Sequence, residues 1–285
     1  MYYNTNVHVK SERLRKNNML HGIDISNWQA GLQLQGLPID FCIVKATEGI
    51  GYVDPSFTNF TNQVLDLGLL YGFYHFAREN RPEDEATYFY NKVSDLIGYG
   101  LPVLDYETSN YDNCEWCERF VARFKELSGI FPVIYCSASV CGEFSGSWLA
   151  DDCALWVAGY PYDFESWIYQ DCPYNIYPWY EPIIWQFTSS LRISDEYKRL
   201  DGNICYISED EWLELSGGNM AISDSDARMI AQYVWEYQYK LGLPDQDNIL
   251  EDLDISKNLD SNRYNVLNAC LALIAKVETL LEKVK

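Results

Sequence analysis

The 285-residue sequence lacks the features that mark several common functional classes. It contains neither a GxGxxG nor a GxxxxGK[ST] loop, so no motif indicates nucleotide binding. No apolar stretch approaches the roughly 20 residues of a transmembrane helix, and no apolar segment follows the basic N-terminus as in a secretory signal. We therefore expect a soluble protein that is made in the cytoplasm. If its target lies outside the membrane, another factor must release it.

Positive charge is scarce. The chain has 21 Lys and Arg against 42 Asp and Glu, a formal net charge of −21. Most of the excess lies in residues 21–219, which hold 10 basic and 30 acidic residues. Because phosphate binding needs a basic surface, this balance argues against nucleic acid as a substrate. It argues equally against adhesion to, or insertion into, an anionic membrane.

Cysteine does not form a recognisable framework. The nine cysteines are scattered, and Cys114 and Cys117 form a lone CxxC without a second pair or nearby histidine. Such a pair alone is weak support for a zinc site. We expect mostly free, partly buried thiols in a reducing compartment.

Short apolar runs alternate with amphipathic stretches over residues 21–218. The predicted strands are His21–Ser26, Phe41–Ala46, Leu69–His75, Leu101–Glu107, Pro132–Ser137, Ala154–Tyr160 and Pro182–Phe187. The clearest predicted helices are Pro55–Leu67, Pro82–Ile97 and Cys114–Leu127. This alternation is typical of a parallel sheet covered on both faces. The predicted fold class is α/β, with a closed β/α barrel favoured over an open doubly wound sheet.

The two ends of the chain differ from this central region. Residues 1–20 are polar and form a predicted flexible extension, and residues 219–285 form a predicted helical region. Within it, residues 262–284 carry a heptad pattern of apolar side chains. This seam could pack as a helical hairpin on itself or on the barrel, hold a homo-oligomer together, or serve in wall targeting.

Two carboxylates stand two residues apart in Asp105-Tyr106-Glu107, after the apolar run 101–104. On a strand, side chains at i and i+2 share a face, with Cα atoms about 6.6–6.8 Å apart. Neighbouring buried carboxylates raise one another's pKa, so that a protonated acid can stand beside an ionised partner. A protonated acid beside an ionised carboxylate is the arrangement that glycosidases use to cleave a glycosidic bond. The alternative is a structural role, in which the pair caps a helix or binds an arginine.

Other candidate site residues lie at the ends of successive predicted strands, where a β/α barrel builds its active site. The candidate catalytic acids among them are Asp24 and Asp201. The remaining candidates are Lys45, Glu48, Tyr74, His75, Tyr135, Trp156, Trp185 and Gln186. Each has a structural alternative: Lys45 and Glu48 could form an ion pair, His75 could be a satisfied core histidine, and Trp156 could pack in the core.

Five segments resemble glycoside hydrolase family 25, the Chalaropsis-type muramidases that are common among phage endolysins. They are His21–Gln29, Phe41–Gly49, Tyr71–Phe76, Pro102–Glu107 and Trp185–Ser190. Their order and spacing across residues 21–215 are similar to those of the family.

The resemblance implies an irregular β/α barrel that hydrolyses the β-1,4 bond between N-acetylmuramic acid and N-acetylglucosamine in peptidoglycan, without metal or organic cofactor. By matching position, Glu107 would be the general acid/base. Asp105 would act as nucleophile or assist the substrate's acetamido group, while Asp24 and Asp201 would be further acids. Tyr74, Tyr135, Trp156 and Trp185 would line the sugar site.

Three alternatives remain at this stage. A chitinase-like barrel also uses D-x-E, but its longer D-x-x-D-x-D-x-E run is missing here. A barrel could bind glycan without cleaving it. A phage tail-associated protein could carry the barrel as a wall-piercing module. We rank the free lytic enzyme first.

Overall fold

The computed structural model describes residues 19–78, 80–107, 113–194 and 199–218. The described residues up to Ser216 belong to one compact unit. The predicted N-terminal extension and the predicted helical region, including the seam over residues 262–284, lie outside the described residues almost entirely.

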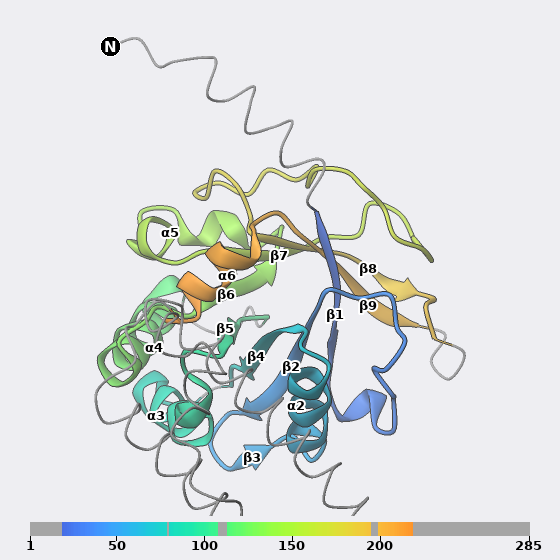
Figure 1. Ribbon diagram of the computed structural model, residues 1–285. Helices are drawn as coiled ribbons and strands as arrows, with labels where there is room; N and C mark the ends of the chain where they lie inside the picture. Colours follow the sequence, from blue (N-terminus) through green and yellow to red (C-terminus); the bar gives the residue numbers. More distant parts are fainter. Residues whose placement is uncertain (1–18, 79, 108–112, 195–198, 219–285) are drawn as a thin grey trace, which may run out of the picture. The chain divides into compact units, whose positions relative to one another are not determined.

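Eight strands close into a barrel (Figure 1). They are β1 (Leu20–Ile25), β2 (Phe41–Glu48), β4 (Leu70–Phe76), β5 (Gly100–Asp105), β6 (Val133–Ser137), β7 (Leu155–Ala158), β8 (Ile184–Leu191) and β9 (Leu200–Cys205). Neighbours follow that order around the ring, and β9 closes it against β1. The short β3 (Tyr52–Val53) pairs with the end of β2 as a hairpin outside the ring. The predicted α/β barrel is confirmed.

The sequence predicted a parallel sheet, but the observed sheet is mixed. Strand β9 runs antiparallel to both β8 and β1, and its register pairs Asp24 with Asp201. The start of β9 therefore lies at the carboxyl ends of the other strands. This reversal brings Asp201 to the end of the barrel where a β/α barrel places its site.

Helices cover part of the outer surface of the barrel (Figure 1). They are α2 (Phe57–Asp66), α3 (Pro82–Val93), α4 (Asn113–Ser128) and the short α5 (Leu149–Asp152), with 3-10 turns η1 (Asn27–Gln29), η2 (Ser94–Leu96) and η3 (Cys141–Phe144). The apolar stripe of α3 includes Ala86 and Phe89, and Phe89 stacks on Phe124 of α4 with ring centroids 5.2 Å apart. This packing buries the outward-facing side chains of the strands beneath the helices.

No regular element is found among the described residues between β7 and β8. This long segment instead packs against the outside of β8 and β1. Thr188 Oγ1 donates to the Phe164 carbonyl at 2.7 Å, and the His21 ring lies 3.0 Å from the Ile168 carbonyl oxygen. The irregular segment thus replaces a helix on this side of the barrel.

The amino-terminal end of the barrel is filled by α6 (Glu209–Leu215). Its Trp212 is fully buried, lies 5.1 Å from the Phe41 ring and donates from Nε1 to the Tyr71 carbonyl at 3.0 Å. Gly22 lies beside Phe41, where a Cβ atom would approach the ring within 2.4 Å. Bulky side chains therefore occupy this end, and the polar candidates gather at the other.

The eight cysteines of the described region are free thiols, as their scattered positions led us to expect. No helix in the described ranges is long and apolar enough to cross a membrane. Across the same residues, no group of three or more His, Cys, Asp or Glu side chains is arranged to hold a metal ion.

Candidate active site

Asp105 is the last residue of β5 and faces the barrel interior, in line with Leu101 and Val103. The strand ends here rather than at Glu107, which follows on the connecting segment and is exposed. Asp105 itself is only 5% exposed, and its Oδ1 accepts no hydrogen bond from any residue that the structure describes. The D-x-E pair therefore consists of one buried acid and one at the rim.

Asp24 lies on β1 and is held by two amide donors. Gln186 Nε2 on β8 and Asn203 Nδ2 on β9 both donate to Asp24 Oδ2, at 2.8 and 2.7 Å. The side-chain oxygen of each amide accepts a further hydrogen bond, which fixes the direction in which its nitrogen points. Gln186 Oε1 accepts from the hydroxyls of Tyr135 and Tyr160, at 2.9 and 2.5 Å. These contacts fix the carboxylate in one orientation across three strands.

The indole of Trp156 supports the same network. Its Nε1 donates to Asn203 Oδ1 at 2.8 Å, which leaves the Asn203 amide nitrogen directed at Asp24. Trp156 also packs edge-on against Tyr135, with ring centroids 4.5 Å apart. The structure thus places Trp156 and Tyr135 inside the barrel beneath the acids.

Four carboxyl groups interact electrostatically at this end of the barrel. Burial, with the charges of Asp201 and Glu107, raises the pKa of Asp24 well above its usual range. Burial and Glu107 do the same to the pKa of Asp105, while Lys45 opposes the shift. Desolvation also raises the pKa of Glu107, again opposed by Lys45. Burial and Glu107 raise the pKa of Asp201 to about 6.

Mutual repulsion and burial in this set favour retention of protons near neutrality. One carboxyl group can then donate a proton while a neighbour is ionised. This division of roles is the requirement of acid-catalysed glycoside cleavage.

Lys45 and Glu48 form an ion pair at the rim. Lys45 Nζ lies 2.6 Å from Glu48 Oε2 and 4.6 Å from the centre of the Phe76 ring. Arg78 donates from Nε to Glu48 Oε1 at 2.8 Å. Glu48, Phe76 and Asp105 lie in register on β2, β4 and β5. The Lys45 ammonium is thereby held over the strand next to Asp105.

The structure separates two pairs of adjacent candidates. Tyr74 and Gln186 face the barrel interior, whereas His75 points outward to the helices and Trp185 points outward to the irregular segment after β7. Successive residues of a strand face opposite sides of the sheet, so both members of such a pair cannot line the interior. The expectation that His75 and Trp185 contact the substrate is therefore corrected.

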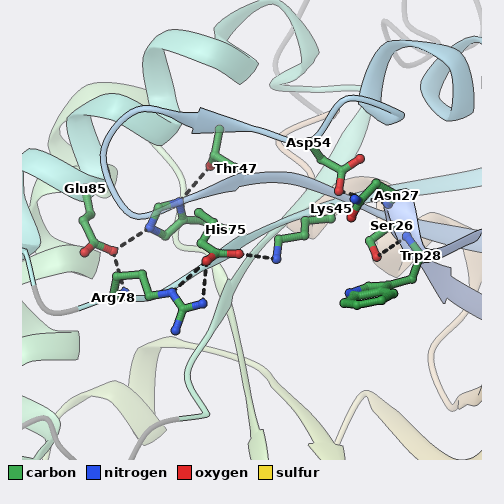
Figure 2. A network of polar contacts seen from close by, with 10 residues as sticks. Ser26, Asn27, Trp28, Lys45, Thr47, Asp54, His75, Arg78 and Glu85 are labelled. Atoms are coloured by element: carbon green, nitrogen blue, oxygen red, sulfur yellow. Dashed lines mark hydrogen bonds and ion pairs between the residues drawn. The ribbon is translucent and has the colours of Figure 1, made fainter. Parts of the chain in front are cut away.

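His75 is instead the centre of a buried polar network (Figure 2). Its Nδ1 lies 2.7 Å from Thr47 Oγ1, and its Nε2 lies 2.8 Å from Glu85 Oε2. Glu85 also accepts the backbone N–H groups of Arg78 and Asn80, at 3.0 and 3.1 Å. The network ties β2, β4 and α3 to the loop that carries Arg78.

Trp185 has a similar structural role. Its side chain is fully buried, packs against Tyr174 and Phe187, and donates from Nε1 to the Gly159 carbonyl at 2.9 Å. It anchors the irregular segment after β7.

Sequence reasoning missed Asn203, Tyr160 and Arg78 as parts of the site. A signal for Asn203 was present, because it lies two residues after Asp201 and would share a strand face with it. Tyr160 lies just beyond β7, but it ended the predicted strand Ala154–Tyr160 on the same face as Trp156, so strand alternation could have indicated it. Arg78 lies just beyond β4 in a segment without regular structure, where no periodicity indicates direction.

The comparisons with known proteins agree with this site. The sequence model of "Glycosyl hydrolases family 25" matches residues 23–196. A curated relative, "Lysozyme M1" of Streptomyces globisporus, is 27% identical over 212 residues, which cover 65% of this chain and 67% of that protein. Some other curated relatives are matched over 45% to 56% of their own length.

Two solved structures share the fold. The bacterial lysozyme from Streptomyces coelicolor has a TM-score of 0.57 at 26% identity, covering 69% of this chain and 96% of that one. The catalytic domain of endolysin ply40, from bacteriophage P40 of Listeria monocytogenes, has a TM-score of 0.54 at 26% identity, covering 70% and 98%. With a family match over more than half of its residues and four acids at the mouth of its barrel, this chain belongs to glycosyl hydrolases family 25.

Proposed function

We propose that the protein is an N-acetylmuramidase, which hydrolyses the β-1,4 bond between N-acetylmuramic acid and N-acetylglucosamine in bacterial peptidoglycan. The observation that carries the proposal is the set of Asp24, Asp105, Glu107 and Asp201 at one end of a family 25 barrel. The relatives named as lysozymes support the choice of peptidoglycan over chitin.

Glu107 is the proposed general acid. Its position beyond the end of β5 leaves it at the rim, where a leaving-group oxygen can reach it, and its raised pKa favours the protonated form. A general acid works best when its pKa lies near the working pH. After bond cleavage, the resulting carboxylate can take a proton from the attacking water.

Asp105 is proposed to act on the other side of the reaction centre. It is buried, and its Oδ1 accepts no hydrogen bond from the described residues, so a substrate N–H would supply the missing donor. In that role it would orient the acetamido group of the substrate. Alternatively, the same oxygen would attack the anomeric carbon and form a glycosyl-enzyme intermediate.

Asp24 and Asp201 are proposed to stabilise positive charge as the glycosidic bond breaks. The transition state resembles an oxocarbenium ion, and fixed negative groups favour it. Asp24 suits this role because two amides hold its carboxylate in place. The ionised form of Asp24 is then already oriented and needs no reorganisation during the reaction.

For the biological setting, we propose a phage endolysin made in the cytoplasm and released to the wall through a holin-type lesion. The similarity to the phage endolysin ply40 supports this setting. A tail-associated lysozyme is the second candidate, and the abundance of the protein in purified virions separates the two.

The test is the chemistry of the products. Digestion of purified peptidoglycan should release fragments with muramic acid at the new reducing end, as read by mass spectrometry after borohydride reduction. Glu107→Gln should lower the rate by 100-fold or more, since general acid catalysis contributes about 10²–10⁴. Glu214→Gln, an exposed change on α6, is the matched control and should leave the rate unchanged. Glucosamine at the reducing end, or full activity of Glu107→Gln, would overturn the proposal.

A further inference from the structure

Trp28 is far more exposed than the other tryptophans that the structure describes. Its side chain is 84% accessible, whereas the other tryptophans in the described ranges are buried or half-buried. It lies on η1, four residues after Asp24, at the end of the barrel where the acids gather. A large apolar ring at this place is available to a ligand.

The turn that carries Trp28 is rigid. Every backbone N–H from Ser26 to Ala30 is bonded: Ser26 donates to Gln29 Oε1 at 3.0 Å, and Trp28 donates to Ser26 Oγ at 3.3 Å. The N–H groups of Gln29 and Ala30 donate to backbone carbonyls of the same turn, at 2.9 and 3.2 Å. A ring presented on a fixed turn loses little conformational entropy when it binds.

Asp54 ties this turn to the neighbouring hairpin (Figure 2). It is buried, and its Oδ2 accepts the N–H of Asn27 at 3.0 Å, while its Oδ1 accepts that of Ser56 at 2.8 Å. The hairpin places Tyr52 next to the rim, with its ring 5.8 Å from Lys45 Nζ. Trp28 therefore belongs to the same edge of the mouth as Lys45.

The order of the strands around the ring determines which rim residues lie opposite one another across the mouth of the barrel. In the ring of eight, β1 and β2 stand opposite β6 and β7. Tyr160, just past β7, is 47% exposed and reaches Gln186 with its hydroxyl. Asp105 on β5 and Asp201 on β9 also lie on opposite sides of the ring, so the line that joins them crosses the line from Trp28 to Tyr160. A linear ligand lying from Trp28 to Tyr160 would thus pass between Asp105 and Asp201.

We propose that Trp28 stacks on a sugar ring of the glycan strand remote from the bond that is cleaved, so that the enzyme acts on long strands lying across the mouth from Trp28 to Tyr160. The proposal rests on the proposed muramidase function, and it adds the direction and the length of the substrate.

The chemistry of the two edges favours a sugar chain. The C–H face of a pyranose packs on an aromatic ring, and an indole offers the largest such face. The Trp28 ring stands at the edge and the Lys45 ammonium lies further in, over Phe76. This arrangement suits a ligand that presents apolar ring faces at the edge and polar substituents further in, as a glycan strand does.

The test measures binding without turnover. Glu107→Gln is combined with Trp28→Ala, and affinity is measured by calorimetry for two probes: long glycan strands freed of peptide by an amidase, and a single tetrasaccharide. Loss of the ring should weaken long-strand binding about tenfold, equivalent to about 1.36 kcal/mol, because a large apolar contact is removed. Tetrasaccharide binding should change less than twofold.

Two further variants separate stacking from disturbance of the fold. Trp28→Tyr keeps an aromatic face and should restore most of the long-strand affinity. Tyr180→Ala removes a ring that is 99% exposed on the irregular segment and should alter neither affinity. Because Trp28 is exposed, thermal unfolding of Trp28→Ala should match that of the parent.

Equal weakening for both probes, or no weakening for the long strands, would overturn the proposal, as would failure of Glu107→Gln to bind long strands at all. The product analysis of the wild type is a separate measurement. A protein that binds long strands through Trp28 but releases no muramic reducing ends would refute the proposed function while leaving the binding site supported.

Discussion

Two buried carboxylates of this barrel, Glu85 and Asp105, have opposite surroundings. Glu85 lies on the helix side, fully buried, and accepts hydrogen bonds from His75 and from the backbone of Arg78 and Asn80. Asp105 lies on the interior side, 5% exposed, and its Oδ1 accepts none from the described residues. Both carboxylates are buried, and they differ in the hydrogen-bond donors around them.

The difference indicates how the protein divides its acids between structure and chemistry. A buried carboxylate that is fully hydrogen-bonded stabilises the elements it joins, whereas an unsatisfied one costs free energy of folding. An unsatisfied acid at the mouth of a barrel is therefore typical of a functional group. Four variants test this contrast.

Asp105→Asn should have the largest effect, and it should fall on activity. We expect the rate of peptidoglycan cleavage to drop about 10³-fold, near 4 kcal/mol of transition-state stabilisation, because the substrate loses its acidic partner. The free energy of unfolding should change by less than about 1 kcal/mol, since burial already favours the neutral form of Asp105. Turnover assays and urea unfolding measure the two quantities. A stability loss as large as the activity loss would remove the contrast with Glu85.

Glu85→Gln should act in the opposite way. An amide nitrogen would face donors at His75 and at the loop backbone, so we expect a loss of about 2–4 kcal/mol in the free energy of unfolding. The matched control is Glu83→Gln on the same helix, where an exposed pair with Arg119 at 2.8 Å is broken. The control should cost less than about 1 kcal/mol. Equal costs for the two variants would show that the buried network adds nothing.

Asp201→Asn should stabilise the protein in a pH-dependent way. Because the pKa of Asp201 is raised from 3.8 to about 6, the folded state binds more protons than the unfolded state between these values. Stability from this group is therefore highest below pH 3.8 and lost as pH rises through about 6. At pH 7 the variant should be more stable by up to about 3 kcal/mol, because a pKa change from 3.8 to about 6 corresponds to that amount at 1.36 kcal/mol per pKa unit, with no gain below pH 3.8. Thermal melts across this range, with exposed Asp95→Asn as control, measure the effect. A gain that is independent of pH would contradict it.

Lys45→Met should have the smallest effect. Lys45 lowers the pKa values of Asp105 and Glu107, so its removal should raise both. The pH profile of kcat/KM should then move to higher pH by less than about one unit, because the site is partly open to water. The exposed Lys92→Met is the control. A shift to lower pH would contradict the assigned electrostatics.

The sequence predicted seven of the eight barrel strands within a few residues of their observed bounds. The missing one is β9, whose inward positions carry Asp201 and Asn203 instead of apolar side chains. Apolar runs reveal a strand only where its inner face is packed with hydrocarbon. Strand β9, which lines the polar site, was therefore not predicted, and neither was its antiparallel direction.

The sequence pointed to the four acids that the barrel brings together at its mouth, but not to every neighbour of them. His75 was a candidate because it lies at the end of a predicted strand, and Trp185 because the family resemblance placed it in the sugar site. Strand alternation turns both side chains outward. The two amides that hold Asp24 come from strands β8 and β9, distant in the sequence. Such contacts depend on barrel closure, which no local pattern encodes.

Trp212, packed against Phe41 beneath the strands, has a consequence for traffic through the enzyme. Trp212 and its neighbours close the amino-terminal end of the barrel, so the described residues form no tunnel through which a glycan chain could pass. Fresh substrate, the attacking water and both halves of a severed strand must use one and the same entrance. Departure of one fragment then becomes a condition for admitting the next.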